Sequence, residues 1–312
     1  MKKYEFDAII LGGGPAGLSA GIYLARANVK TAIIETSMIG GQPANYLEIE
    51  NYPGFCSIGG YELMEKFEEH LDKFGVEKFE MQEIIFVDLC SEKKLIKTTD
   101  YIFESKTVII ACGASCKKLG IKGEKEFLGR GVSYCAICDG AFYQDKTVAV
   151  VGGGNSALEE ALYLTKFAKK VYLVHRRNEF RADKIVQERV FNNDKIEVVL
   201  NSSPLEIYGN NTVEKLILKD TQASEVSEII VDGVFPYIGY SPNIECIAHQ
   251  LQQDVNGFII TDETMKTSEK GVFAVGDVRK TPLRQVVTAV SDGAIGAVYA
   301  GRYIESLQKS CA

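Results

Sequence analysis

Two cysteines, Cys135 and Cys138, stand two residues apart, and a carboxylate, Asp139, follows them directly. Thiols at this spacing can close into a disulfide and reopen, and their chemistry runs through the thiolate, whose pKa such motifs lower. The same spacing also suits half of a zinc site. The segments around the pair must therefore decide which of the two chemistries it performs.

A glycine-rich turn follows a buried strand near the N-terminus. Residues 7–11 are apolar, and residues 12–17 match the pattern G-x-G-x-x-G ahead of a helix expected over 18–27. In this pattern the glycines make the turn, admit a pyrophosphate and allow close packing of helix and strand. A second strand, 31–34, ends at Glu35, where an acid can accept a hydrogen bond from a ribose hydroxyl. The predicted dinucleotide residues here are Gly12, Gly14, Pro15, Ala16, Gly17 and Glu35.

A second copy of this arrangement lies in the middle of the chain. Residues 147–151 predict a strand, residues 158–167 a helix and residues 171–174 a further strand. The turn between the first two has the related pattern G-x-G-x-x-A, so the chain contains two dinucleotide folds. The predicted nucleotide residues of this turn are Gly152, Gly154, Asn155, Ser156 and Ala157.

The two copies differ at the end of their second strands. Glu35 and His175 stand equally far from the first glycines of their turns, but His175 opens a basic group. An acid at this place suits a free 2′-hydroxyl, whereas arginines suit a 2′-phosphate, which guanidinium groups bind through paired hydrogen bonds. A solvated basic patch is the alternative. We expect NADPH rather than NADH at the second site, held by His175, Arg176, Arg177 and Arg181.

Further segments resemble those that contact FAD in flavoproteins with two dinucleotide-binding domains. They are 40–42, 50–54, the strand and turn 107–114, and the strand 272–277 that delivers an acid to the ribityl chain. Cys112 replaces the threonine that the family carries in its Ala-Thr-Gly motif. The FAD residues that the resemblance implies are Gly41, Gln42, Asn51, Ala111, Gly113, Gly276, Asp277, Arg284, Gln285 and Val286.

Taken with the thiol motif and the basic group, these segments cover nearly the whole chain, which resembles the low-molecular-weight, bacterial-type NADPH-dependent thioredoxin reductases. The resemblance implies an α/β fold of two Rossmann-like domains, each of three-layer ββα type, with the NADPH domain inserted into the FAD domain. The expected FAD domain is residues 1–114 and 244–312, and the expected NADPH domain, with the redox disulfide, is residues 115–243.

The implied activity is that of a thioredoxin-disulfide reductase, in which electrons pass from NADPH through FAD and the Cys135–Cys138 disulfide to oxidised thioredoxin. By this resemblance Cys138 faces the flavin and Cys135 attacks the partner. Larger reductases use a histidine base near the C-terminus, and no histidine follows His249. Asp139 is therefore the predicted proton carrier, with a plain surface role as the alternative.

Nicotinamide and disulfide need the same flavin face, so the resemblance also implies a domain rotation. Its hinges are expected at residues 113–115 and 239–242, which are rich in small residues and proline. Arg130 and Phe142 flank the thiol motif and are candidate contacts for thioredoxin, although Phe142 also suits a core position. An apolar helix from Val286 to about residue 307 is expected to help form a homodimer.

Composition and net charge limit the partners and the cellular location that the protein can have. The 312 residues are 46% hydrophobic and carry a net charge of −7, which disfavours nucleic acid as a partner. No stretch reaches the ~20 apolar residues of a membrane span. The eight cysteines are spread along the chain, unlike a secreted disulfide scaffold. We therefore expect a soluble cytoplasmic protein without a bound metal, and no function for Cys311.

Three alternatives stay open on the residues alone. Cys112, Cys116 and the thiol pair could together imitate a four-thiolate zinc site. The disulfide substrate could be a glutaredoxin-like or peroxiredoxin-linked protein instead of thioredoxin. The chain could also be a redox-inactive flavin-binding protein or one that takes electrons from ferredoxin, although ferredoxin-fed relatives lose the NADPH motif that is intact here.

Overall fold

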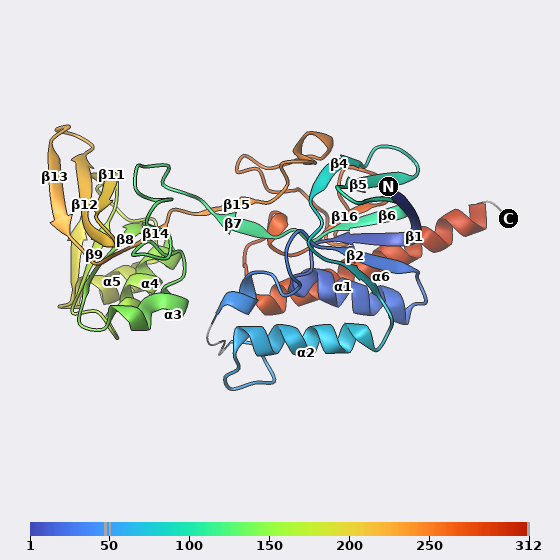
Figure 1. Ribbon diagram of the computed structural model, residues 1–312, viewed down its shortest axis with the longest axis horizontal. Helices are drawn as coiled ribbons and strands as arrows, with labels where there is room; N and C mark the ends of the chain where they lie inside the picture. Colours follow the sequence, from blue (N-terminus) through green and yellow to red (C-terminus); the bar gives the residue numbers. More distant parts are fainter. Residues whose placement is uncertain (47–48, 50, 311–312) are drawn as a thin grey trace. The chain divides into compact units, whose positions relative to one another are not determined.

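The computed structural model describes residues 1–46, 49 and 51–310, with the backbone alone at 137, 138 and 310. Glu50, part of the predicted flavin loop, and Cys311 lie outside the described residues. The chain folds as two compact units (Figure 1). Unit 1 contains residues 1–115 and 241–312, and unit 2 contains residues 116–240.

Unit 1 is built on a sheet in the order β3-β2-β1-β6-β5-β4, with β16 also paired to β6. The pairs among β1, β2, β3, β6 and β16 are parallel, and β4 and β5 extend the sheet in antiparallel fashion. Helices α1, α2 and α6 cover one face of this sheet (Figure 1), and apolar clusters fill both faces. The bounds are β1 Lys2–Leu11, α1 Pro15–Arg26, β2 Thr31–Ile34, α2 Gly60–Asp72, β3 Glu77–Phe79, β4 Ile84–Asp88, β5 Lys94–Thr98, β6 Tyr101–Ile110, β16 Val272–Ala274 and α6 Val286–Ser310.

Unit 2 has three layers. A parallel sheet, β10-β9-β8-β14, lies between helices α3 to α5 and a three-stranded antiparallel sheet, β11-β12-β13 (Figure 1). One apolar cluster joins the helices to the parallel sheet and another joins the two sheets. The bounds are α3 Ala136–Asp139, β8 Thr147–Gly152, α4 Asn155–Leu164, β9 Lys170–Val174, α5 Lys184–Phe191, β10 Ile196–Val199, β11 Ser202–Gly209, β12 Val213–Asp220, β13 Val226–Ile230 and β14 Gly233–Tyr237.

The two crossings between the units pair with each other. Strand β7, Ala114–Cys116, lies beside β15, Tyr240–Pro242, in a two-stranded sheet of their own. Single-turn 3-10 helices occupy Gln42–Asn45, Gly140–Tyr143, Ala248–Gln250 and Gly276–Val278. Within the described residues, no helix combines the length and apolar character that a membrane span requires.

The predicted fold class, α/β with two Rossmann-like domains, is confirmed. Several details of the prediction were wrong. The sequence predicts two strands, one at 101–103 and one beginning at Thr107. They form a single strand, β6, because Ser105 and Thr107 are buried and Ser105 Oγ donates to the Thr107 carbonyl within the strand. The helices that follow the two glycine turns start three residues earlier than expected, at Pro15 and Asn155. Strands β3, β11 and β14 were not predicted.

Candidate functional site in unit 2

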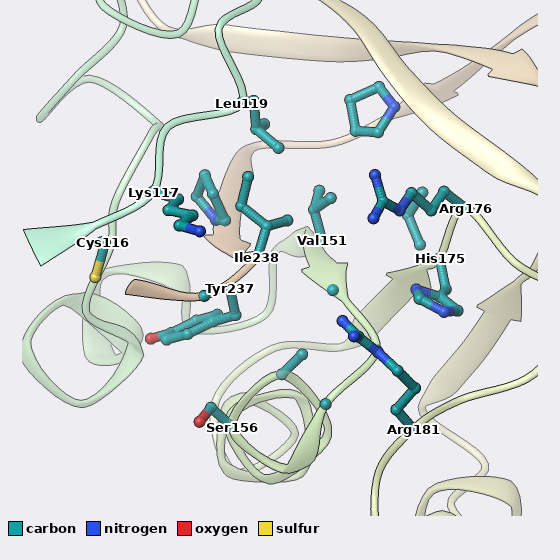
Figure 2. Close-up of a pocket in the computed structure, with 18 of the residues that line it drawn as sticks. Cys116, Lys117, Leu119, Val151, Ser156, His175, Arg176, Arg181, Tyr237 and Ile238 are labelled. Carbon is teal, nitrogen blue, oxygen red and sulfur yellow. The ribbon is translucent and has the colours of Figure 1, made fainter. Parts of the chain in front are cut away.

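The glycine turn after β8 opens onto a cavity of about 530 Å³ that lies within unit 2 (Figure 2). Eight of the nine residues predicted to bind NADPH line it, and Arg177 does not. The cavity is lined in addition by residues that sequence reasoning missed, among them Cys116, Lys117, Tyr237 and Tyr240. The eight predicted lining residues are Gly152, Gly154, Asn155, Ser156, Ala157, His175, Arg176 and Arg181.

His175 is 5% exposed, and its Nε2 has no hydrogen-bond partner in the described structure. Burial first, and then the neighbouring arginines, lower the pKa of His175, so the ring is neutral at pH 7. Arg176 and Arg181 line the cavity beside this ring (Figure 2), and the Arg181 amide is held by the Gly153 carbonyl at 2.8 Å. An unpaired buried nitrogen and two guanidinium groups on one wall suit a phosphorylated ligand that can accept hydrogen bonds.

The glycines of this turn have different neighbours. A Cβ built on Gly152 would lie 2.3 Å from the Tyr237 carbonyl oxygen, and one on Gly153 would strike the His175 ring. A Cβ on Gly154 would meet nothing within 4 Å, so this glycine leaves open space next to the N-terminus of α4. Open backbone at a helix N-terminus is what a pyrophosphate requires.

This difference predicts opposite effects for two equal substitutions. Gly152→Ala is expected to destabilise the protein by about 1–3 kcal/mol, because the methyl group overlaps backbone that cannot move aside. Gly154→Ala is expected to leave stability nearly unchanged but to weaken NADP⁺ binding, since the methyl group would enter the space predicted for the phosphates. Thermal unfolding and calorimetric titration with NADP⁺ measure the two effects. Equal stability losses in both variants would contradict the assignment.

The segment that carries the thiol pair, residues 133–139, precedes the same turn in the chain and is called the redox segment below. Cys135 is disulfide-bonded, while the side chain of Cys138 lies outside the part of the chain that is described. The Cys135 amide donates to Ser133 Oγ at 3.0 Å, and the Asp139 amide donates to the Cys135 carbonyl at 3.1 Å. Asp139 therefore stands one helical turn after Cys135. The next amide, that of Ala136, donates to Tyr237 Oη at 2.7 Å.

A zinc site fits these thiols poorly. Cys112 and Cys116 are free, but a cysteine held in a disulfide, such as Cys135, has no thiolate to offer a metal. Burial raises the pKa of Cys112 to about 12, and its Sγ lies 3.4 Å from the Leu11 carbonyl. Among the described residues no group of three or more His, Cys, Asp or Glu side chains has the geometry to hold a metal ion.

In unit 1 the segments predicted to contact FAD come together from distant parts of the chain. The Asn51 side chain donates to Gln285 Oε1 at 2.8 Å across 234 positions. The Gln42 side chain donates to the Ala114 carbonyl. Cβ atoms built on the glycines show how closely the other segments approach one another. The paired positions are Gly12 with Ala111, Gly41 with Gly14, and Gly276 with Ala16.

Two predicted flavin residues, Asp277 and Arg284, have buried polar groups that a polar ligand could engage. Burial raises the pKa of Asp277 to about 6, although the positive charge of Arg284 opposes that rise. Arg284 Nε is buried without a hydrogen-bond partner, and its guanidinium lies 4.1 Å from the centre of the Phe258 ring. Glu35 is already engaged, since Oε2 accepts from the Gly13 amide at 2.7 Å and Oε1 from the Ser37 amide at 2.9 Å. A ligand with sugar hydroxyls fits Asp277 and the second lone pair of Glu35 Oε2, since Oε1 also accepts from the hydroxyls of Thr36 and Ser37.

Sequence reasoning missed a supporting ion pair behind Asp277. Asp292 on α6 accepts from Arg279 Nε at 2.8 Å, with both side chains largely buried, and from the Gly276 amide at 3.2 Å. This pair fixes the turn that presents Asp277. The one carboxylate in the Ala-, Val- and Gly-rich stretch 286–301 of this helix was the available signal.

The raised pKa of Asp277 predicts a pH effect. Its ordinary value is 3.8, so the folded, flavin-free protein keeps a proton that the unfolded chain loses between about pH 4 and 6. This contribution to stability is complete below about pH 4 and is lost as the pH rises through 6. Asp277→Asn should therefore raise the melting temperature of flavin-free protein more at about pH 7.5 than at about pH 5. The same gain in melting temperature at both pH values would contradict this prediction. The affinity of Asp277→Asn for FAD should be lower than that of the unsubstituted protein at both pH values.

Comparison with known proteins agrees with this geometry. A family model described as pyridine nucleotide-disulphide oxidoreductase matches residues 6–293. A thioredoxin reductase of Bacillus subtilis is 47% identical over 98% of this chain and 96% of its own. The crystal structure of Lactococcus lactis thioredoxin reductase in the FR conformation matches with a TM-score of 0.84 and 43% identity, covering 96% and 99% of the two chains. A ferredoxin-flavin thioredoxin reductase from Clostridium acetobutylicum matches at 33% identity and a TM-score of 0.54, over 97% and 99%.

The fold and the site thus define a pyridine nucleotide-disulphide oxidoreductase. The chain belongs to this family, among its bacterial-type thioredoxin reductases. Enzymes of this kind are flavoproteins that use FAD and NADPH.

Proposed function

We propose that the protein passes electrons from NADPH through FAD to a disulfide between Cys135 and Cys138, and from there to oxidised thioredoxin. The observation that carries this proposal is the position of the disulfide-bonded Cys135 beside the basic cavity of unit 2. The next amide, that of Ala136, is hydrogen-bonded to Tyr237, which lines that cavity. When bound, FAD supplies the two-electron chemistry that links a hydride donor to a disulfide. The choice of thioredoxin as the substrate follows from the relatives, which are named thioredoxin reductases.

The residues of unit 2 divide into three tasks toward NADPH. The turn from Gly152 to Ala157 offers amides and the α4 N-terminus to the pyrophosphate. Arg176 and Arg181 hold the 2′-phosphate, and Arg177 contributes charge from outside the cavity wall. His175 is neutral and buried, so it offers a hydrogen-bonding nitrogen without a charge.

The residues of unit 1 are proposed to hold FAD. Gly12, Gly14 and Gly17 form the turn for its pyrophosphate, with Glu35 beside one ribose and Asp277 beside the ribityl chain. The 3-10 turn at Gly276 is fixed by Asp292, as described above. The remaining proposed contacts are Pro15, Ala16, Gly41, Gln42, Asn51, Ala111, Gly113, Gly276, Arg284, Gln285 and Val286.

The thiols act in sequence. Two electrons and one proton open the disulfide into a thiol and a thiolate, the Cys135 thiolate attacks the partner disulfide to form a mixed disulfide, and Cys138, on losing its proton, attacks Cys135 to release the reduced partner. Asp139 carries the proton for this exchange. Its place one helical turn after Cys135 supports that role, since the Asp139 amide is bonded to the Cys135 carbonyl.

Unit 2 is proposed to rotate between the two half-reactions. The hinges are residues 113–115 and 239–242. Gly113 has φ +65° and Gly239 has φ +111°, so both crossings contain a residue in a conformation that favours glycine. Proposed domain limits are residues 1–114 with 244–312 for FAD and 115–243 for NADPH.

Thioredoxin is proposed to dock beside the redox segment, on Arg130 and Phe142. Phe142 is 72% exposed, which supports a docking role over a place in the core. The protein is further proposed to act as a homodimer, with Val287 and Val298 among the exposed apolar side chains of α6. A reducing cytoplasmic setting suits the free thiols, among which Cys56, Cys90 and Cys246 are exposed.

A second electron donor is suggested by one structural relative. The Clostridium acetobutylicum protein is described as a ferredoxin-flavin thioredoxin reductase, so ferredoxin is a candidate in place of NADPH. Arg176, Arg181 and the buried His175 around the cavity favour NADPH instead.

A donor comparison tests the proposal. The FAD-loaded protein is mixed with oxidised thioredoxin and a thiol reporter, and NADPH, NADH or reduced ferredoxin is added in separate runs. We expect rapid thiol release with NADPH and little with the other two. Equal rates with NADH would overturn the 2′-phosphate assignment, and release with ferredoxin alone would establish the second candidate. No release with any donor would contradict the proposed transfer of electrons to oxidised thioredoxin.

A further inference from the structure

Tyr237, the last residue of β14, is fixed by the glycine turn of unit 2. Its backbone pairs with Gly152 across the parallel ladder, and a Cβ on Gly152 would lie 2.3 Å from the Tyr237 carbonyl oxygen. The phosphate-binding turn therefore determines where this tyrosine stands. Any shift of the turn is passed to Tyr237 through direct backbone contact.

The side chain of Tyr237 reaches from the nucleotide cavity to the redox segment. Its ring lines the cavity, with Cys116 and Ser156 nearby (Figure 2). Its hydroxyl oxygen accepts a hydrogen bond from the Ala136 amide at 2.7 Å, and Ala136 is fully buried. A buried amide that loses its acceptor is left unpaired away from water, which is unfavourable, so this bond is a firm constraint on the peptide that follows Cys135.

The backbone of Cys135 is held on its other side by Ser133. The Cys135 amide donates to Ser133 Oγ at 3.0 Å, and the Ser133 hydroxyl in turn contacts the Cys135 carbonyl at 3.2 Å. Ser133 does not line the cavity, whereas Tyr237 does. Of these two supports, Tyr237 is the one that a bound nucleotide can touch.

We propose that Tyr237 is a positioning residue that couples nucleotide occupancy of the cavity to the geometry of the Cys135 thiol. This inference rests on the proposed function, which places NADPH in that cavity. A nucleotide packed on the ring restricts the ring, the hydroxyl then holds the Ala136 peptide in one position, and the thiol loses freedom to meet a small reagent. An empty cavity leaves the same segment freer.

Alkylation rates test this coupling without enzyme turnover. Cys138→Ser leaves Cys135 as a free thiol, and peptide mass spectrometry follows iodoacetamide labelling of Cys135 and Cys116 separately, with and without saturating NADP⁺. Cys116 is a free thiol on the cavity wall, so its protection reports that the nucleotide is in place. We expect NADP⁺ to slow labelling of both cysteines, that of Cys135 by about fivefold or more, the lower range of ordinary coupling between two sites.

Adding Tyr237→Phe keeps the ring in the cavity wall and removes the acceptor. NADP⁺ should then still protect Cys116 but no longer change the rate at Cys135. The matched control is Tyr240→Phe, which removes a hydroxyl from another tyrosine of the cavity wall and should leave the effect on Cys135 intact. Because the Tyr240 side chain is hydrogen-bonded to Cys116, only the rate at Cys135 is compared in this variant.

The outcomes separate this inference from the proposed function. If NADP⁺ protects Cys116 but never alters Cys135, or alters it equally with Tyr237→Phe present, the coupling is overturned while the nucleotide site stands. If Cys116 is not protected at all, the placement of NADPH in the cavity fails, and the inference fails with it.

Discussion

Replacing Cys135 by serine is expected to abolish NADPH-dependent reduction of thioredoxin, by at least about a thousandfold, because the nucleophile of the thiol exchange is lost. Loss of yellow flavin absorbance on adding NADPH should continue, since Cys135 takes no part in that half-reaction. Absorbance at the flavin band and a thiol reporter, measured in the same sample, separate the two half-reactions.

Cys90→Ser is the matched control for this experiment. Cys90 is an exposed, free thiol of unit 1, so its loss should leave both readouts unchanged. Turnover that survives in the Cys135→Ser enzyme would show that the wrong thiol has been assigned. Flavin that no longer bleaches would show that the substitution damages more than the disulfide.

Arginine substitutions are expected to change the choice between NADPH and NADH. Arg176→Ala and Arg181→Ala each remove a guanidinium from the cavity wall. A hydrogen bond to a charged group contributes about 1.5–3 kcal/mol, so each variant should raise KM for NADPH about 10- to 100-fold. KM for NADH should barely change, because NADH has no 2′-phosphate. Steady-state kinetics with both nucleotides give the comparison.

Arg177→Ala provides the internal reference, because Arg177 belongs to the same basic group but does not line the cavity. Its loss should raise KM for NADPH only slightly. This small effect should become smaller still in high salt, because salt screens the interaction between exposed charges. Three equal effects would mean that net charge, and not contact with the phosphate, determines the preference.

The parts of the site that sequence predicted best are those set by short spacing. The glycine turns, Glu35 and the basic group after β9 follow local rules, since a strand, a turn and a helix N-terminus leave little freedom over some 20 residues. Which arginines face the cavity was beyond such rules. Arg176 and Arg177 are neighbours in sequence, and only the course of the backbone after β9 decides which of them lines the wall.

Contacts between distant segments were the other limit. The Arg279–Asp292 ion pair behind Asp277 depends on how α6 packs against the turn, and the bond from Ala136 to Tyr237 spans 101 positions. Neither residue type nor spacing signals such a meeting. Strand β6 was split in the prediction for a related reason, because Ser105 and Thr107 look like a polar break until the partner that buries them is known.

The paired crossings β7 and β15 also bear on how such a chain can arise. The strands of unit 1 on either side of the crossings, β6 and β16, are themselves parallel neighbours, with Val272 opposite Val108. The host sheet is thus complete without unit 2, and the two ends of unit 2 leave it side by side. Unit 2 is therefore arranged so that a single insertion event can place it in a domain whose sheet is already complete. Exchanging residues 116–240 between relatives should accordingly transfer nucleotide preference and thiol chemistry together, as one heritable module.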